Sequence, residues 1–380
     1  MPAPALVLTG GGARAAYQVG VLKAIAQLLP RRPIPFRVIL GTSAGAVAAS
    51  VIAARARRWH RAIQQIENVW GNFHVDQVFR VGGWTMLRAG THWLLALLSG
   101  GVLLPSPKSL FDNTPLRELL HRSVAWRNLR RSVARGDIAA LGLCATGYSS
   151  ALSVTFYEGR PNLVDWARRQ HLGVRAELNL RHLMASLAVP FLFPPERLGD
   201  EFYGDGAMRQ MSPLSPAIHL GADRLLVIGV RAPHQSGVVE KRPGVPVPPS
   251  PGQLFGYALD TLFMDQIYND IEQLERMNKL LRVAPGAAAG ARTVRTLLIT
   301  PSEDPRAVAL RNLDACPRSL RVLLRVIGAG DVGGAQLASY LMFEQAYTRD
   351  LIALGYRDAM ARGPELVRFL TEEILDDAVS

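Results

Sequence analysis

The chain has 380 residues, of which 49% are hydrophobic and 19% are charged. This apolar fraction excludes a disordered chain, and the length is enough for one large domain or two moderate ones. The two cysteines, Cys144 and Cys316, are too few for a disulfide framework or a thiolate metal site. The formal net charge of +12 favours anionic partners, either nucleic acid or an anionic membrane surface.

The basic charge is concentrated near the N-terminus. No Asp or Glu precedes Glu67, whereas the segment 1–66 carries nine Lys or Arg side chains. The segment 67–380 is nearly balanced, with 34 basic against 31 acidic side chains. Arginine makes up most of the basic side chains, a bias that a GC-rich genome also produces. The charge is therefore better treated as a local property of the segment 1–66.

The segment 1–55 predicts a strand, a glycine turn and a helix, twice in succession. The predicted strands are Ala5–Leu8 and Phe36–Leu40. The first predicted helix covers residues 13–29, and the second follows the turn at Gly41–Gly45 and ends at about Ala54. Apolar residues recur at helical spacing in the first helix. A βαβα start of this kind is typical of a parallel sheet covered by helices.

The rest of the chain predicts further strands and then mostly helix. We expect strands at Leu141–Thr146, Leu152–Tyr157, Phe202–Tyr203, Arg224–Val230 and Val294–Thr300, helices over residues 183–195 and 253–281, and mainly helix over residues 306–380. Six prolines between Pro233 and Pro251 indicate a linker. We therefore expect a first domain over residues 1–231, a linker or loop over 232–252, and a mainly helical C-terminal region over 253–380 that packs on the core.

Neither a secretory signal nor a membrane span is expected. The N-terminus lacks a basic segment, and its apolar stretch, residues 3–8, is shorter than the core of a signal peptide. The strongest later apolar run, Trp93–Leu104, has about a dozen residues, against roughly 20 for a bilayer span. This run predicts a core helix or, alternatively, an exposed apolar cap.

Gly41-x-Ser43-x-Gly45 is the strongest local pattern for chemistry. It lies between an apolar strand and a helix of small residues, where flanking glycines allow a strained turn that presents a serine. The helix that follows directs N–H groups and a positive dipole toward that serine. We interpret Ser43 as a candidate nucleophile.

Gly10-Gly11-Gly12-Ala13-Arg14 is the second pattern. A glycine run that opens a helix presents N–H groups, which can hold an oxyanion or a phosphate. A dinucleotide loop would need an acidic residue about 20 positions later, and none precedes Glu67. An oxyanion hole for Ser43 is the favoured interpretation, and a glycine turn used only for close packing is the alternative.

A nucleophilic serine also needs a base. The eight histidines end at His234, inside the proline-rich stretch, and none lies in a recognisable catalytic context. Asp205, in Tyr203-Gly204-Asp205-Gly206-Ala207, is the alternative base, although Asp-Gly is also a common turn pair.

Taken in this order, the glycine loop, the serine elbow and Asp205-Gly206-Ala207 resemble the patatin-like phospholipases. The resemblance covers about residues 4–230 and includes the stretch 185–195, and the tail around residues 338–343 and 354–356 also resembles bacterial members. Ala15 and Ala207 stand where many members have glycine. The resemblance implies a three-layer α/β/α fold with a central, mostly parallel sheet, followed by a mainly helical C-terminal extension.

The resemblance also implies a Ser–Asp dyad without histidine. Ser43 would be the nucleophile and Asp205 the general base. The remaining implied site residues are Gly10, Gly11, Gly12, Ala13 and Arg14 in the oxyanion loop, Gly41 and Gly45 in the elbow, and Gly206 and Ala207 in the aspartate turn. We expect no cofactor and no metal.

The expected function is lipid acyl hydrolysis of the phospholipase A or lysophospholipase type. The expected partners are a phospholipid or other acyl ester and an anionic membrane contacted peripherally, with no nucleic acid, in a cytoplasmic protein. Because Ser43 lies within the basic segment 1–66, we expect a cationic neighbourhood around it. The alternatives are a non-catalytic lipid- or membrane-binding protein and an esterase or thioesterase for soluble acyl substrates.

Overall fold

A computed structural model describes most of the chain. The described residues are 4–30, 32–80, 109–232, 248–261, 266–284, 292–329 and 334–371. The apolar run Trp93–Leu104, His234 and most of the proline-rich stretch lie outside them. The three-part domain division stays a prediction.

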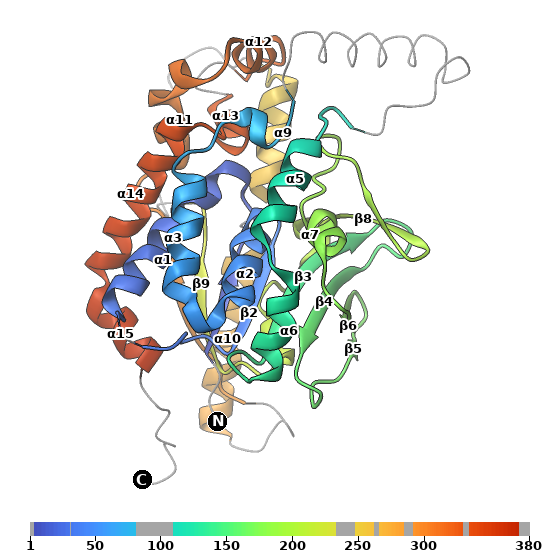
Figure 1. Cartoon of the computed structure of the whole chain (residues 1–380), viewed down its shortest axis with the longest axis vertical. Coiled ribbons are helices and arrows are strands. Elements are labelled where there is room, and N and C mark those ends of the chain that lie inside the picture. The colour runs from blue at the N-terminus through green and yellow to red at the C-terminus, as the bar shows by residue number, and fades with distance from the viewer. Residues whose placement is uncertain are drawn as a thin grey trace.

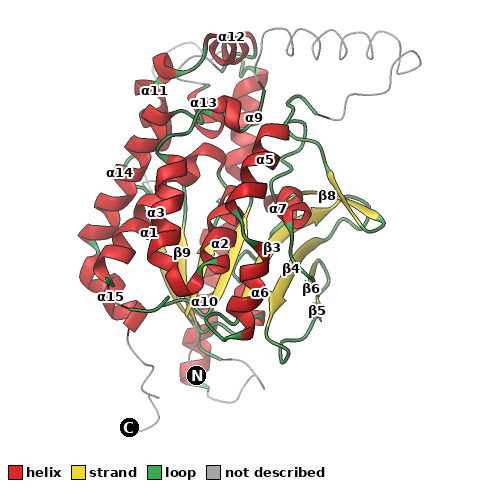
Figure 2. Ribbon diagram, viewed as in Figure 1, coloured by secondary structure: helices red, strands yellow, loops and turns green. Residues whose placement is uncertain are grey.

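A mixed sheet with a parallel centre forms the middle layer (Figure 2). Its main path runs β10-β9-β1-β2-β3-β4-β6-β5. The parallel centre consists of β1 (Pro4–Leu8), β2 (Val38–Thr42), β3 (Ala140–Gly147), β9 (Arg224–Ile228) and β10 (Arg295–Ile299). Every residue of β1, β2, β3 and β9 is buried, as expected for strands covered on both faces.

Antiparallel pairing beyond β3 carries the aspartate to the serine. The strands on this side are β4 (Ser153–Gly159), β5 (Trp166–Ala167), β6 (His171–Arg175), β7 (Glu196–Leu198) and β8 (Glu201–Asp205). Strand β8 pairs antiparallel with β3, with Asp205 opposite Ala145. Thr42 lies opposite Cys144 on the other side of β3. The register therefore brings Ser43, which follows Thr42, and Asp205 to the same edge of the sheet.

Helices cover the sheet and pack around its edge (Figure 1). Those before β9 are α1 (Ala16–Leu28), α2 (Ala44–Ala54), α3 (Trp59–Trp70), α5 (Thr114–Ser123), α6 (Trp126–Ala134), α7 (Leu180–Ser186) and α8 (Ser215–His219). Those after β9 are α9 (Pro251–Asp260), α10 (Gln266–Val283), α11 (Pro305–Arg311), α12 (Arg318–Val326), α13 (Ala335–Leu341), α14 (Gln345–Ala361) and α15 (Gly363–Thr371). Helices α1, α2, α3 and α6 lie in front of the strands in Figure 1, and α14 lies along α1.

The structure confirms the fold class, and it corrects one predicted helix. The helix expected over residues 183–195 is α7, which ends at Ser186. A continuing helix would conflict with Pro190 and would use the Ala188 carbonyl, which instead accepts a hydrogen bond from the Asp205 N–H at 2.8 Å. The helix expected over residues 253–281 is assigned as α9 and α10, and residues 262–265 between them are not described.

Short strands were not predicted on the antiparallel side. Strands β5 and β7 have only 2 and 3 residues, too few to show an alternating pattern. Among the described helices, none has both the length and the apolar composition to cross a bilayer.

Candidate active site

Ser43 lies at a strained turn between β2 and α2. Its backbone has φ 52° and ψ −130°, in a region that side chains other than glycine seldom adopt. Its N–H donates a hydrogen bond to Ser186 Oγ at 3.0 Å. A Cβ at Gly45 would lie 2.5 Å from the Leu8 carbonyl oxygen, so the helix can approach β1 this closely only with glycine there. This glycine of the elbow therefore has a packing reason.

Asp205 ends β8 and is almost completely buried. Its Oδ1 accepts a hydrogen bond from the Ala207 N–H at 2.9 Å. No described residue forms a hydrogen bond of standard geometry with its Oδ2. Burial raises the pKa of Asp205 from 3.8 to about 7, and the Ser43 hydroxyl and the Ala207 N–H partly offset this rise. A carboxyl group with this pKa can accept a proton near neutral pH.

The glycine loop faces the same space as Ser43. Gly11 is the N-cap of the 3-10 turn Gly12–Ala15. The first N–H groups of a helical turn have no acceptor within it. Gly12 has φ +53°, and a Cβ there would lie 2.4 Å from the Tyr340 carbonyl oxygen. This position therefore requires glycine both for its backbone conformation and for its contact with α13.

Arg14 points away from that space, into a buried polar cluster. Its guanidinium pairs with Asp260 Oδ1 at 2.7 Å and donates to Ser339 Oγ at 2.8 Å. The Tyr340 ring lies 3.9 Å from the guanidinium carbon, and the Tyr340 hydroxyl also donates to Asp260 Oδ1 at 2.6 Å. The end of the glycine loop is thus anchored to α9 and α13.

An apolar groove extends from Ser43 and Gly12. Its volume is about 740 Å³ when counted out to its open mouth. Apolar side chains of α2, α3 and α5 line its length, among them Val47, Val51, Ile66, Val69, Leu116 and Leu120. Leu187, Val189, Phe193 and Phe343 add to the wall. A groove with this apolar lining suits a hydrocarbon chain better than a polar ligand.

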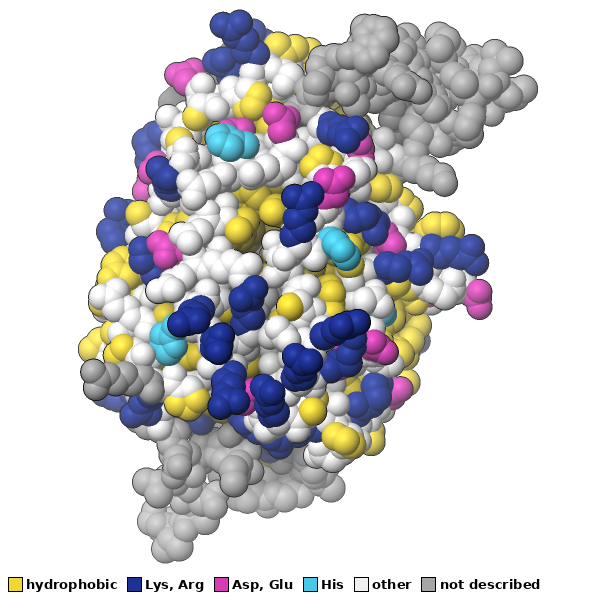
Figure 3. Space-filling view, in the orientation of Figure 1, with side chains coloured by type: hydrophobic (Ala, Val, Ile, Leu, Met, Phe, Trp, Pro, Cys, Tyr) yellow, Lys and Arg dark blue, Asp and Glu magenta, His cyan; other side chains and the backbone are white. Residues whose placement is uncertain are grey.

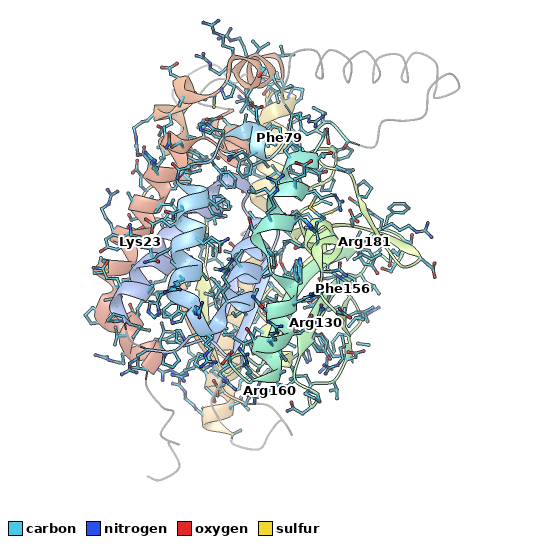
Figure 4. All side chains as sticks on the ribbon, viewed as in Figure 1. Lys23, Phe79, Arg130, Phe156, Arg160 and Arg181 are labelled. Carbon is cyan, nitrogen blue, oxygen red and sulfur yellow. The ribbon has the colours of Figure 1, made fainter. Side chains whose placement is uncertain are left out.

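An aromatic cluster packs beside the groove. Phe79, labelled in Figure 4, stacks on Phe111 with ring centroids 4.3 Å apart. The Phe343 ring lies 6.3 Å from Phe79 and 5.8 Å from Phe73, centroid to centroid. Phe343 belongs to the C-terminal half of the chain, so this half completes a wall built mainly by the N-terminal half.

The expected cationic neighbourhood of Ser43 is wrong. Arg14 is buried and paired with Asp260, and Lys23, which is labelled in Figure 4, pairs with Glu67 at 2.7 Å. Arg55 and the arginines after it follow the far end of α2, about 18 Å from Ser43 at 1.5 Å per residue. Sequence proximity was misleading because α2 carries the chain away from the site.

The structure brings the predicted site residues together. Ser43, Asp205, residues 10–14 and the glycines of both turns gather at one edge of the sheet. No histidine lines the groove within the described part of the chain. Nor do three His, Cys, Asp or Glu side chains of that part cluster in a way that could hold a metal.

Four contributing residues were given no role in the site by the sequence. These are Ser186, Asp260, Tyr340 and Phe343. Residues 116, 119 and 120 at helical spacing could have predicted the α5 wall of the groove. Asp260 offered no such signal, because its partner Arg14 is 246 residues away in the chain.

The sheet, the serine turn and the buried aspartate define a three-layer α/β protein with a serine elbow at its sheet edge. The chain belongs to the patatin-like phospholipase family, whose model matches residues 6–218, more than half of its length. A comparison with curated proteins finds no match.

The following three structures are among the solved structures that are similar to the chain. VipD from Legionella pneumophila is 14% identical, with a TM-score of 0.35 over 96% of this chain and 67% of that one. Human GIVD cytosolic phospholipase A2, in complex with methyl gamma-linolenyl fluorophosphonate, is 13% identical, with a TM-score of 0.44 over 97% and 58%. The type III effector protein ExoU is 12% identical, with a TM-score of 0.37 over 98% and 54%. The chain thus spans little more than half the length of the last two.

Proposed function

We propose that the protein is a lipid acyl hydrolase of the phospholipase A or lysophospholipase type that works through Ser43 and Asp205. The observation that carries the proposal is the position of Asp205. It is a buried carboxyl group with a pKa of about 7 that interacts with the hydroxyl of a serine lining an apolar groove. The groove would hold the acyl chain while the ester carbonyl lies at Ser43.

The reaction proceeds through an acyl-enzyme. Ser43 Oγ bonds to the ester carbonyl carbon as Asp205 accepts its proton, and the N–H groups of the Gly10–Gly12 loop hold the oxyanion. The carbon–oxygen bond to the alcohol then breaks, and Asp205 returns the proton to the leaving oxygen. Water then attacks the acyl-enzyme carbonyl as the same carboxylate accepts its proton. The bond between Ser43 Oγ and the acyl carbon breaks, Asp205 returns the proton to Ser43 Oγ, and the fatty acid is released. The proposal uses neither a metal nor a cofactor.

The substrate is a phospholipid or another acyl ester, met at an anionic membrane surface by a cytoplasmic protein that binds peripherally. An esterase or thioesterase acting on soluble acyl substrates is the nearest alternative. A non-catalytic lipid-binding protein is the second, and it would use the groove without the dyad.

Labelling with a fluorophosphonate probe tests the proposal without knowledge of the substrate. We expect the wild-type protein to be labelled, and Ser43→Ala to lose both labelling and ester hydrolysis. Ser50→Ala is the matched control, because Ser50 is a buried serine of the helix after the elbow whose Oγ donates only to the Ala46 carbonyl among described residues. Full hydrolysis by a folded Ser43→Ala protein would end the proposal.

A further inference from the structure

A cleft lined by arginines lies beyond the far end of the apolar groove. It has a volume of about 1260 Å³ counted with its open side. Its arginines come from the connection between α2 and α3, from the start of α3 and from the end of α6; they are Arg55, Arg57, Arg58, Arg61, Arg131 and Arg135. Asp137 is the one acidic residue in its described lining. The cleft thus concentrates positive charge that the active site does not use.

These arginines are available to a ligand. All six are exposed, and none forms an ion pair with an acidic side chain among the described residues. Arg131 donates a long hydrogen bond of 3.4 Å to Asn128. The neighbouring Arg130 differs, because it pairs with Glu177 (Figure 4). Several unpaired guanidinium groups around one concavity favour phosphate groups, which they bind in a forked geometry.

The cleft and the groove share the same two helices. Val51 of the groove lies one turn from Ala54 of the cleft on α2, and Gln65 lies one turn from Arg61 on α3. Figure 3 shows basic side chains gathered across the lower half of this face, below a hollow with hydrophobic side chains at its floor. A surface that presents phosphate groups beside hydrocarbon chains would contact the cleft and the groove at the same time.

The distance from Ser43 excludes the head group of the lipid being cleaved. Arg55 is about 18 Å from Ser43 along α2, at 1.5 Å per residue. The phosphate of a glycerophospholipid is only a few bonds from its ester carbonyl. The cleft must therefore contact other anionic molecules when a substrate ester lies at Ser43.

We propose that the arginine cleft is the site at which the protein binds the phosphate groups of neighbouring anionic phospholipids, so that this face lies on the membrane. The inference rests on the proposed lipid hydrolase function and assigns its membrane contact to named residues. Nucleic acid is disfavoured because the described cleft lining holds no aromatic side chain for base stacking.

Vesicle flotation tests the site in the Ser43→Ala protein, so that binding is measured without turnover. The test variant adds Arg58→Gln, Arg61→Gln and Arg131→Gln. The matched control adds Arg282→Gln, Arg318→Gln and Arg357→Gln, three exposed arginines on α10, α12 and α14. Vesicles contain phosphatidylcholine alone or with phosphatidylglycerol. Equal melting temperatures establish that both variants are folded.

We expect the test variant to lose on the order of 100-fold in binding to anionic vesicles, at about fivefold per arginine. The control should lose far less, and binding to neutral vesicles should not distinguish the two. Added salt should weaken the binding of the parent protein. Equal losses in both variants would overturn the proposal, because the effect would then come from total charge.

Two further outcomes would also overturn it. One is saturable binding of inorganic triphosphate by the parent without vesicle binding, which would indicate a soluble phosphate ligand. The other is tighter binding to single-stranded DNA than to anionic vesicles at the same salt concentration. Failure of the proposed function is distinguishable from either: a protein that binds vesicles through these arginines but hydrolyses no ester would keep the cleft assignment and lose the dyad.

Discussion

Residues 6–218, which the family model matches, and the residues after 248 contribute differently to the same site. The first region supplies the candidate chemical groups: Ser43, Asp205 and the glycine loop. The second region supplies none of these. It provides Asp260 and Tyr340 against Arg14, and Phe343 in the wall of the groove.

The two regions also differ in what fixes their residues. The serine elbow and the aspartate turn are local structures, set by neighbouring glycines and by strand register. The Arg14 cluster is a long-range contact between side chains that are almost completely buried. A buried charge in such a cluster depends on its partner, since an unpaired guanidinium loses its hydration without compensation. We therefore expect that substitutions in the C-terminal region that remove the partners of Arg14 also lower the activity of the active site.

The largest effect should come from Asp260→Ala. It leaves the Arg14 guanidinium without its carboxylate partner, and breaking such a buried pair costs about 3–5 kcal/mol. Urea unfolding would measure the loss, and ester hydrolysis should fall with it because the glycine loop is no longer anchored. The control is Asp314→Ala, which removes an exposed carboxylate of the same region that lies 3.5 Å from Arg321.

A double variant separates charge from packing. Arg14→Met with Asp260→Leu replaces both charges by apolar side chains, and we expect it to recover most of the stability that Asp260→Ala loses. If Asp260→Ala is no less stable than Asp314→Ala, the C-terminal region does not hold the loop through this pair.

A smaller effect should distinguish the two loop glycines. Gly12→Ala places a Cβ against the Tyr340 carbonyl oxygen at a positive φ, so the backbone must move. We expect hydrolysis to fall by about 10²–10³, as for a lost oxyanion donor. Steady-state kinetics on one ester would measure the change.

Gly11→Ala is the matched comparison. Its Cβ would lie 2.5 Å from Val230 Cγ2, which is a side-chain atom and not backbone. Val230→Ala should therefore restore activity to Gly11→Ala, whereas no side-chain truncation should rescue Gly12→Ala. Equal rescue of both would show that the α13 backbone does not constrain the loop.

Local sequence patterns predicted the parts of the fold that local physics determines. The central strands are buried apolar runs, and the elbow glycines mark a turn that few other residues allow, so both could be located from the sequence. Asp205 could be proposed as a base only beside the other two motifs, because Asp-Gly alone is a common turn pair. The roles assigned to these residues stay predictions, although their meeting at one sheet edge follows from the register.

Features set by tertiary contact could not be predicted. The early end of α7 depends partly on the Ala188 carbonyl bonding to the Asp205 N–H. The charge around Ser43 was misjudged because neighbours in sequence lie at opposite ends of α2. Asp260 has no pattern of its own, since only the fold brings it to Arg14. These residues share one property: their environment comes from distant parts of the chain.

The smallest effect should appear in the pH dependence of hydrolysis. This measurement tests the contribution of residues 6–218 separately from that of the C-terminal region. If Asp205 is the base, it must be ionised, so kcat/KM should rise about tenfold per pH unit below the Asp205 pKa and level off above about 7. The causes of this pKa are burial, Ser43 and Ala207, all within the family-matched region. In Asp260→Ala, which changes the C-terminal region, the plateau value of kcat/KM should thus be lower, whereas the pH at the midpoint of its rise should not change. A shifted midpoint in that variant would mean that the two regions are electrostatically coupled.

The free energy of unfolding should also depend on pH through Asp205, but it should fall over the range in which the rate of hydrolysis rises. Because the pKa of Asp205 is raised from 3.8 to about 7 by folding, the folded protein holds a proton that the unfolded chain releases across this window. The contribution of Asp205 to stability therefore falls as the pH rises from 3.8 to about 7. Asp205→Asn does not titrate, so its melting temperature relative to wild type should increase through the window while its activity is lost. A constant difference between the two melting temperatures would show that the Asp205 carboxyl group is not desolvated. The reason for its raised pKa would then be removed.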